Sequence, residues 1–312
     1  MMQGWRALPP TLRRACIVAA VFCLSCSDWA AATARGGFVE VGTLGAPLRL
    51  WVEEDGHGDP ILLIHGVGGS TYSWRKIVRT LARTHHVISV DLKGFGRSDK
   101  PFDRAYGLLD QAHLLKRLIH LRGLHDVTLV GHSFGGGVAL ALTLAVNATE
   151  PGAVRQLVLV DSVAYRQSFP LFVRLVQTPL LGEAGIYGSP PELVAYKGLL
   201  AAYQDPSKIS FDTVRAYALP LYELGGRHAL LQTTRSIIPP NLSTLIARYP
   251  TIHQPTLLIW CAEDSVVPLW VGRRLSRALP NARLSVLRGC GHVPQEELPA
   301  TTRSLIGAFV NR

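Results

Sequence analysis

The sequence predicts an α/β fold in which a mostly parallel β-sheet carries helices on both of its faces. Short apolar runs typical of buried strands alternate with segments whose apolar residues recur at helical spacing. The alternation stops over residues 162–254, where helix-like pieces and two pairs of prolines replace the strands, and then resumes. Because both ends of this segment join predicted strands, we expect a helical insertion rather than a separate domain on a linker.

The expected elements follow in order along the chain. Two strands at 38–41 and 48–52 partly alternate apolar and polar residues, as half-solvated antiparallel strands do. Continuously apolar strands are expected next at 61–64, 87–90, 127–130 and 157–160. The helices between them are expected at 74–81, 108–119 and 138–146. After the insertion we expect a strand at 257–260, a helix at 269–279, a strand at 284–287 and a helix at 301–310.

The composition limits the classes of protein that the chain can belong to. It has 312 residues and is 48% hydrophobic, which is enough to bury a core and excludes a disordered protein. Its formal net charge is +10, but the basic residues are scattered, so we expect a solvated basic surface and no nucleic-acid partner. No apolar run reaches the roughly 18 residues of a membrane-spanning helix, so no stable transmembrane segment is expected in the mature chain.

Residues 1–34 have the pattern of a secretory signal peptide. They combine a basic start, an apolar run over 15–26 and a small-residue cleavage signal at 32–34. We therefore expect cleavage after Ala34 and export to the periplasm or the outside of the cell. The alternatives are a misassigned start site and a membrane anchor. Lipid attachment at Cys26 is a further alternative, although the residues before it match a lipoprotein signal poorly.

Residues 131–135 read Gly-His-Ser-Phe-Gly, which has the form G-x-S-x-G. The pentapeptide follows a predicted buried strand and precedes a predicted helix, the context in which it forms a sharp turn that presents a nucleophilic serine. Glycines at both ends leave room for that turn. The sequence therefore predicts Ser133 as a nucleophile, the alternative being an ordinary glycine-rich turn.

A serine nucleophile needs a base and an acid that orients the base. His292 follows the predicted strand 284–287, and Asp264 follows the predicted strand 257–260. The carboxyl ends of parallel strands share one edge of a sheet, where α/β proteins place their sites. We therefore predict His292 as the base and Asp264 as the acid. Asp161, which follows an earlier strand, is a rival acid, and Glu263 is a lesser one.

The negative oxygen formed during acyl transfer needs fixed donors. The backbone N–H of Phe134, after the nucleophile, is one predicted donor. The second is expected from the glycine-rich loop 65–69, and we assign it to the N–H of Val67. A flexible strand-to-helix turn is the alternative interpretation of that loop.

Other polar residues near these motifs are predicted to have supporting roles. His132 lies inside the turn but points away from the serine, so it is interpreted as a support. His65 is expected to orient backbone in its loop. Asp91, with Arg97, is expected to anchor the loop 91–98.

Together these residues resemble the α/β-hydrolase family over residues 36–312. The resemblance rests on His65-Gly66 after a strand, the loop 91–98, the turn at Ser133, Asp264 before Val266-Val267-Pro268, and Gly291-His292. It implies an eight-stranded, mostly parallel sheet with a helical cap after the sixth strand. The hydrolase core would then comprise 35–161 and 251–312, and the cap would comprise 162–250.

The resemblance also narrows the chemistry. Family members that are haloalkane dehalogenases or epoxide hydrolases use an aspartate where this chain has Ser133, which argues against both. Carboxylesterases and lipases, carbon–carbon bond hydrolases, lactonases and cofactor-free haloperoxidases remain. We predict a serine hydrolase acting on a small carboxylic ester, without a metal or an organic cofactor. The alternatives are a carbon–carbon bond hydrolase and a non-catalytic ligand-binding protein.

The predicted cap is rich in large apolar side chains, among them Phe169, Phe172, Tyr187 and Tyr222. They predict an apolar acyl pocket, although the same residues could form the core of the cap itself.

Two cysteines remain if the signal peptide is removed. Cys261 lies three residues before Asp264, and Cys290 lies two residues before His292. The predicted acid and base must meet, so their loops are expected to be neighbours, and export would place the chain in an oxidising compartment. We therefore predict a disulfide between Cys261 and Cys290. The alternative is a pair of buried, unpaired thiols.

Overall fold

A computed structural model describes residues 35–311, and the predicted signal peptide, including Cys26, lies outside the described residues. The described chain forms one eight-stranded sheet in the order β1-β2-β4-β3-β5-β6-β7-β8. The strands are β1 (Arg35–Glu40), β2 (Arg49–Asp55), β3 (Pro60–Ile64), β4 (His86–Val90), β5 (Val127–His132), β6 (Val154–Val160), β7 (Thr256–Cys261) and β8 (Ala282–Leu287).

The directions of the strands confirm the mostly parallel sheet that the sequence predicts. β2 pairs with β4 in the antiparallel sense. All the pairings from β4 through β3, β5, β6 and β7 to β8 are parallel. The carboxyl ends of β5, β6, β7 and β8 therefore lie along one edge of the sheet, where the loops that follow them meet.

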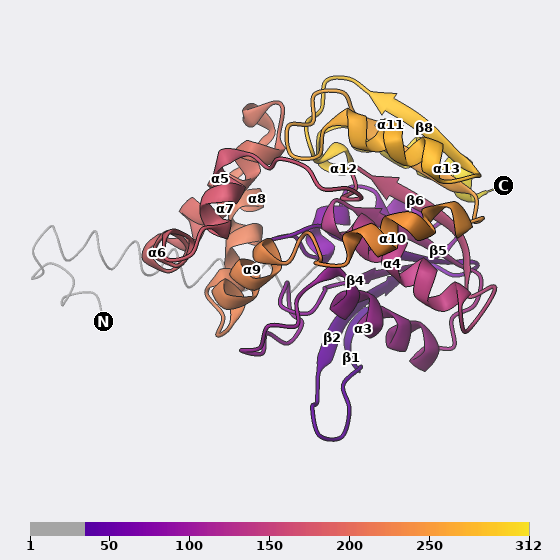
Figure 1. Cartoon of the computed structure of the whole chain (residues 1–312), viewed down its shortest axis with the longest axis horizontal. Helices are drawn as coiled ribbons and strands as arrows, with labels where there is room; N and C mark the ends of the chain where they lie inside the picture. The colour runs from indigo at the N-terminus through magenta and orange to yellow at the C-terminus, as the bar shows by residue number, and fades with distance from the viewer. Residues whose placement is uncertain (1–34, 312) are drawn as a thin grey trace, which may run out of the picture. The chain divides into compact units, whose positions relative to one another are not determined.

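The helices outside the segment between β6 and β7 cover both faces of the sheet (Figure 1). They are α2 (Val78–Leu81), α3 (Leu108–Leu121), α4 (Phe134–Asn147), α11 (Leu269–Ala278), α12 (Pro294–Glu297) and α13 (Pro299–Val310). Leu62 and Ile64 of β3 pack in the core that includes α3 and α4. Ile61 and Leu63 of the same strand pack in the core that includes α13. This burial on both faces is why the strand is apolar at every position.

The segment predicted as one helix over 74–81 is broken in the structure. A 3₁₀ turn, η3 (Thr71–Trp74), comes first, and the single-turn helix α2 follows it. The hydroxyl of Ser70 accepts a hydrogen bond from Tyr72 N–H and so caps the start of η3. Trp74 and Ile77 are fully buried, so the apolar spacing reflects packing beneath the sheet rather than one continuous helix.

The regular elements between β6 and β7 are all helical and are joined by loops. They are α5 (Leu171–Gln177), α6 (Leu181–Gly188), α7 (Pro191–Ala202), α8 (Phe211–Ala218), α9 (Gly226–Arg235) and α10 (Leu242–Arg248). Helices α5 to α9 are grouped on one side of the molecule (Figure 1). By contrast α10 packs on the main core through Leu245, although it falls within the predicted cap 162–250.

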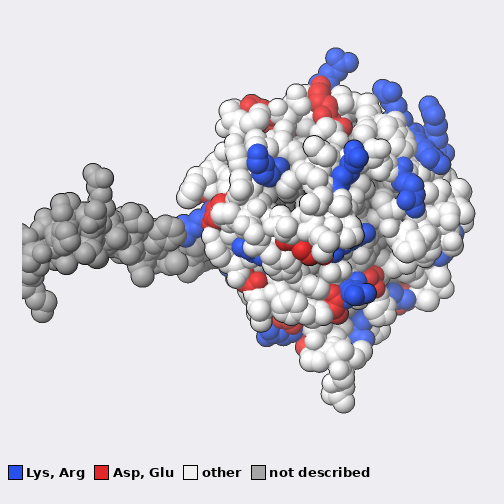
Figure 2. Space-filling model, turned by 60° about the vertical axis from the view of Figure 1, so that its left-hand side comes forward, with Lys and Arg blue, Asp and Glu red and all other residues white. Residues whose placement is uncertain are grey.

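The distribution of charged side chains and the lengths of the helices are relevant to binding of nucleic acids and to insertion into membranes. Figure 2 shows a face on which Lys and Arg side chains are dispersed over a largely uncharged surface. Within residues 35–311, none of the helices has both the length and the apolar character needed to cross a bilayer.

Candidate active site

Ser133 lies on a sharp turn between β5 and α4. Its backbone has φ +55° and ψ −119°, which a residue with a side chain rarely adopts. The glycines around it are required by space: a Cβ on Gly131 would lie 2.5 Å from the carbonyl of Gly135, and one on Gly135 would lie 2.3 Å from the carbonyl of Ile64. The turn thus places Ser133 directly before the first residue of α4, at the positive end of the helix dipole.

The structure brings Ser133, His292 and Asp264 together in one chain of hydrogen bonds. His292 Nδ1 lies 2.8 Å from Asp264 Oδ2, and His292 Nε2 lies 2.7 Å from Ser133 Oγ. Because a carboxylate only accepts, Nδ1 carries the proton and donates it to Asp264. Nε2 is then the free acceptor for the Ser133 hydroxyl, which is the arrangement required for proton abstraction from a serine.

Asp264 is held in its loop by backbone donors. Its Oδ1 accepts hydrogen bonds from the N–H groups of Val266 at 2.7 Å and Val267 at 3.0 Å. Its Oδ2 is left for His292. Three donors are thus directed at this carboxyl, which fixes Asp264 in the orientation that lets it stabilise an imidazolium.

His132 supports the loop that carries His292. Its Nε2 donates a hydrogen bond of 2.6 Å to the backbone carbonyl of His292, and the two ring centres lie 4.9 Å apart. Burial, followed by the proximity of His292, keeps the pKa of His132 well below its usual range. His132 is therefore a neutral support and does not contact the Ser133 hydroxyl, as the sequence interpretation expected of it.

Both segments that carry the predicted oxyanion donors lie close to Ser133. Phe134 follows it as the first residue of α4. The loop that carries Val67 approaches Ser133 closely, as a Cβ added to Gly66 would lie only 2.9 Å from Ser133 Cβ. Val67, Ser133 and Phe134 line the same cavity.

His65 and Asp91 hold the surrounding loops. His65 donates from Nδ1 to the carbonyl of Gly66 at 2.7 Å and accepts at Nε2 from Leu92 N–H at 3.0 Å. Burial lowers the pKa of His65 to about 4, which keeps it neutral. Asp91 accepts from the N–H groups of Thr71 at 2.6 Å and Arg97 at 2.8 Å. The anchoring contact to Arg97 is thus made through backbone.

The rival acids have other partners. Asp161 is fully buried and accepts a hydrogen bond from Cys261 N–H at 2.9 Å. Glu263 is exposed and accepts from Gly289 N–H at 3.2 Å. Of the three carboxylates considered, Asp264 is the one bonded to His292.

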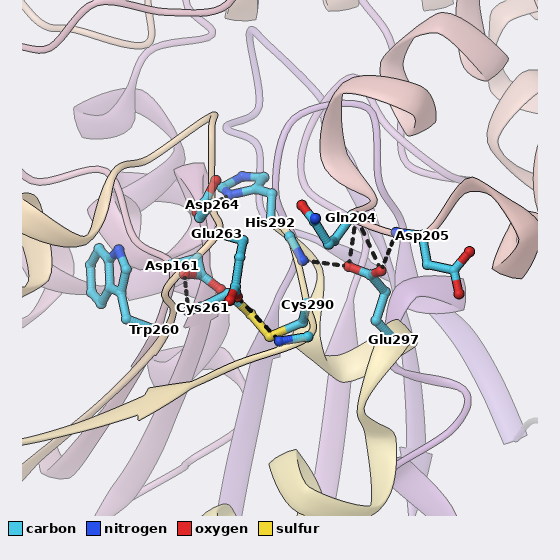
Figure 3. Close-up of a disulfide and its surroundings, with 12 residues drawn as sticks. Asp161, Gln204, Asp205, Trp260, Cys261, Glu263, Asp264, Cys290, His292 and Glu297 are labelled. Carbon is cyan, nitrogen blue, oxygen red and sulfur yellow. Dashed lines mark hydrogen bonds and ion pairs between the residues drawn. A yellow bond between two sulfur atoms is a disulfide. The ribbon is translucent and has the colours of Figure 1, made fainter.

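A disulfide joins Cys261 to Cys290 (Figure 3), with the Cα atoms 5.6 Å apart. Cys261 is the last residue of β7, and Cys290 stands two residues before His292. The bond therefore ties the loop of Asp264 to the loop of His292.

Ser133 and His292 open into a cavity of about 180 Å³ between the sheet edge and the cap helices. Its walls are mostly apolar, and no Lys, Arg, Asp or Glu lines it among the described residues. The lining includes Val67, Phe169, Phe172, Val194, Leu199, Leu230 and Val293.

Of the four aromatic residues expected at the pocket, Phe169 and Phe172 line the cavity. Tyr187 and Tyr222 are exposed, at 50% and 63% of their full surface. The hydroxyl of Tyr222 donates to the carboxylate of Glu192 at 2.7 Å, so the polar tip directs this side chain outward.

The sequence analysis missed a polar spot in the cavity wall. The hydroxyls of Ser73 and Tyr217 lie 3.0 Å apart, and both residues line the cavity. Tyr217 also donates to Glu296 at 2.5 Å. Arg75 forms an ion pair with the same carboxylate at 2.6 Å. No motif marks these residues, because they come from three separate segments of the chain. The proximity of Glu296 to His292 in the sequence was the only available signal.

In residues 35–311, no group of three or more His, Cys, Asp or Glu side chains is arranged to hold a metal ion.

Comparisons with known proteins place the chain among hydrolases. Residues 61–304 match the alpha/beta hydrolase family. The chain is 28% identical over 274 residues to the 2-hydroxymuconate semialdehyde hydrolase of Pseudomonas sp. (strain CF600), covering 86% of this chain and 92% of the relative. It is 27% identical over 278 residues to Lipase 1 of Psychrobacter immobilis, covering 86% and 82%. Among solved structures, the meta-cleavage product hydrolase of Pseudomonas fluorescens shares the fold, with a TM-score of 0.72 at 24% identity over 88% of this chain and 96% of that one.

Proposed function

The chain is a member of the alpha/beta hydrolase family, and on that premise we propose that it is a serine hydrolase that cleaves carboxylic esters with an apolar acyl group. The observation that carries the proposal is the chain of hydrogen bonds from Ser133 through His292 to Asp264, at the mouth of an uncharged apolar cavity.

The geometry supports an acyl-enzyme mechanism. Ser133 Oγ attacks the acyl carbon while His292 Nε2 takes the hydroxyl proton, and Asp264 stabilises the imidazolium that forms. The N–H groups of Val67 and Phe134 bind the negative oxygen of the tetrahedral intermediate. The intermediate collapses and expels the alcohol, which receives the proton from His292. Water then loses a proton to His292, attacks the acyl carbon and releases the acid.

A carbon–carbon bond hydrolase is the second candidate, because a relative at 28% identity is named 2-hydroxymuconate semialdehyde hydrolase. The name of that substrate denotes a carboxylate. No cationic side chain lines the cavity of this chain. Burying an unpaired carboxylate against apolar walls costs several kcal/mol, so the cavity favours an uncharged acyl group.

The size of the cavity sets the expected length of the acyl chain. About 180 Å³ is close to the roughly 150 Å³ of an apolar protein cavity that holds benzene. An acyl group of about four to eight carbon atoms fits such a space. Longer chains would have to extend past the cap.

We also propose that the enzyme is exported, on the pattern of residues 1–34. A disulfide between Cys261 and Cys290 suits an oxidising compartment. Sequencing the N-terminus of the protein in the cell envelope and medium is expected to find Arg35. An intact Met1 on an active cytoplasmic enzyme would contradict export.

Hydrolysis of p-nitrophenyl esters from acetate to dodecanoate tests the activity. Wild type is expected to prefer the middle of the series, and Ser133→Ala is expected to lose about 10³-fold or more with an unchanged thermal midpoint. Asp264→Asn should fall steeply as well, because it disfavours the required tautomer of His292. Ser265→Ala is the matched control, since its hydroxyl is exposed beside Asp264.

Two outcomes of the same experiment decide against the proposal. Equal rates for wild type and Ser133→Ala would mean that the cavity binds ligands without this chemistry. Faster turnover of 2-hydroxymuconate semialdehyde than of any ester would favour the carbon–carbon bond hydrolase.

A further inference from the structure

Asp161 is a buried carboxyl group that the mechanism above does not use. It follows β6, has no exposed surface and adopts a positive φ of +42°. Its Oδ1 accepts a hydrogen bond from Cys261 N–H at 2.9 Å, which fixes the side chain against the end of β7 (Figure 3). A carboxyl held in a strained backbone conformation requires a reason for its position.

The second carboxyl oxygen of Asp161, Oδ2, is buried and needs a hydrogen-bond partner. It receives no hydrogen bond from any N–H or O–H donor of the described residues. The loop of Asp264 follows the neighbouring strand β7, so the carboxyls of Asp161 and Asp264 lie at the same edge of the sheet and close enough to interact. Two carboxylates only accept, so such a contact is favourable only when one of the two carries a proton.

The donors around the pair decide which carboxyl carries it. Asp264 accepts from Val266 N–H, Val267 N–H and His292 Nδ1–H, so its charge is well stabilised. Asp161 accepts from one backbone N–H. Burial, followed by the charge of Asp264, raises the pKa of Asp161 well above its usual range, and Glu297 acts in the same direction.

We propose that Asp161 is a neutral carboxylic acid that donates a hydrogen bond from Oδ2 to Asp264 and thereby positions the acid of the triad. The inference rests on the proposed function. Asp161 touches neither substrate nor the reacting atoms, so it is a positioning residue. Its hydrogen bond fixes the rotation of the Asp264 carboxyl and withdraws negative charge from it.

Replacement by asparagine and by alanine separates the neutral acid from a carboxylate. Asparagine has the same shape as the protonated acid, donating to Asp264 and accepting from Cys261 N–H, whereas alanine does neither. With p-nitrophenyl butyrate, Asp161→Ala should lose about 10-fold or more in kcat with little change in KM, as expected for one hydrogen bond to a charged group. Asp161→Asn should restore most of that loss.

The pH at which kcat/KM falls on the acid side of its pH profile is a second readout. A merely structural role of Asp161 would leave that pH unchanged. Without the donor, the full negative charge of Asp264 acts on the imidazolium of His292 and stabilises it more strongly, so Asp161→Ala should shift the acid limb to higher pH. Asp161→Asn keeps this side chain neutral and keeps a hydrogen-bond donor to Asp264, so the acid limb of this variant should stay at the wild-type pH. Glu263→Gln, which removes an exposed carboxylate beside Asp264, is the matched control.

Three outcomes would overturn the proposal. A shift of the Asp161→Asn limb to lower pH would show that Asp161 is an anion in the wild type. Asparagine as damaging as alanine, in folded protein, would show that a carboxylate is required. Alanine with wild-type kcat and profile would show no positioning role.

An infrared difference spectrum tests the protonation state without any turnover. At neutral pH, wild type minus Asp161→Asn should show the C=O band of a protonated carboxylic acid, and its absence would contradict the assignment. A wild type that hydrolyses no ester would defeat the proposed function while leaving this spectrum interpretable.

Discussion

The backbone N–H of His292 donates a hydrogen bond of 2.6 Å to the carbonyl of Ala202, the last residue of cap helix α7. The helix that lines the cavity therefore also holds the loop of the predicted base. Gly291 makes this approach possible, since a Cβ there would lie 2.5 Å from the same carbonyl. This hydrogen bond therefore couples the position of cap helix α7 to the position of His292.

Glu297 secures this junction, because its carboxylate accepts from the N–H groups of Gly291 at 2.7 Å, Gln204 at 3.1 Å and Asp205 at 3.0 Å. Glu297→Ala should leave these donors without their partner and lower the free energy of unfolding by at least about 2 kcal/mol. Ester turnover should fall with it. Glu192→Ala, which removes a carboxylate on the outer side of the cap, should leave both unchanged in denaturant melts and rate assays.

The disulfide should contribute to both stability and activity. It closes a loop with a sequence separation of 29 residues. In the chain-entropy model such a bond is worth about 3 kcal/mol, so the double variant with Cys261→Ser and Cys290→Ser should lose about that much, along with part of its turnover. Peptide mapping without reductant should recover Cys261 linked to Cys290. Recovery of both as free, alkylated thiols would rule the bond out.

Gly198 lies on the inner side of α7, where it lines the cavity. The nearest atom that a Cβ there would meet is a ring carbon of Phe172 at 4.0 Å, so a larger side chain can fill the space. Gly198→Leu should reduce kcat/KM for p-nitrophenyl hexanoate at least 10-fold relative to acetate, because two or three methylenes lose their burial at about 0.8 kcal/mol each. Tyr196→Leu, on the exposed side of α7, should leave the ratio unchanged. An unaltered ratio in Gly198→Leu would place the acyl chain elsewhere.

His65 should make the fold sensitive to acid. Its folded pKa of about 4 lies below the usual 6.5, so its contribution to stability is fully present above pH 6.5 and is lost as the pH falls toward 4. The free energy of unfolding of wild type should exceed that of His65→Gln at pH 7.5, and the gap should narrow by about 3 kcal/mol at pH 4. Urea melts at both pH values measure the gap. A gap that does not change with pH, as expected for the exposed His113→Gln, would contradict a buried neutral His65.

Much of the sheet was predictable because the burial of a strand determines which of its residues are apolar. The strand at 61–64 is apolar at every position since its two faces enter two cores. The turn at Ser133 was predictable because a residue with a side chain does not fit at the positions of Gly131 and Gly135. The break between η3 and α2 was not, because apolar spacing over 74–81 reports which side chains are buried and not whether the backbone is one helix.

Contacts within the cap, and contacts between side chains that no motif marks, could not be predicted from the sequence. Phe172 lines the cavity while Tyr187 faces solvent, although both are aromatic residues of the same helical segment. The direction of each depends on packing between cap helices. Likewise, Asp161 and Asp264 lie about a hundred positions apart in the sequence, and the neighbouring strands β6 and β7 bring their loops to one edge of the sheet. From the sequence alone the two carboxyls are rivals for one role, whereas we propose that they are partners.

Covalent capture of the nucleophile tests the proposed chemistry most directly. A fluorophosphonate reacts with a serine only when a base activates it, so one molar equivalent should add to wild type, and digestion with mass spectrometry should place the adduct on Ser133. Ser133→Ala should take up none, and His292→Ala should react far more slowly. Stoichiometric labelling of another residue, or no labelling of folded wild type, would contradict the assignment of Ser133 as the nucleophile.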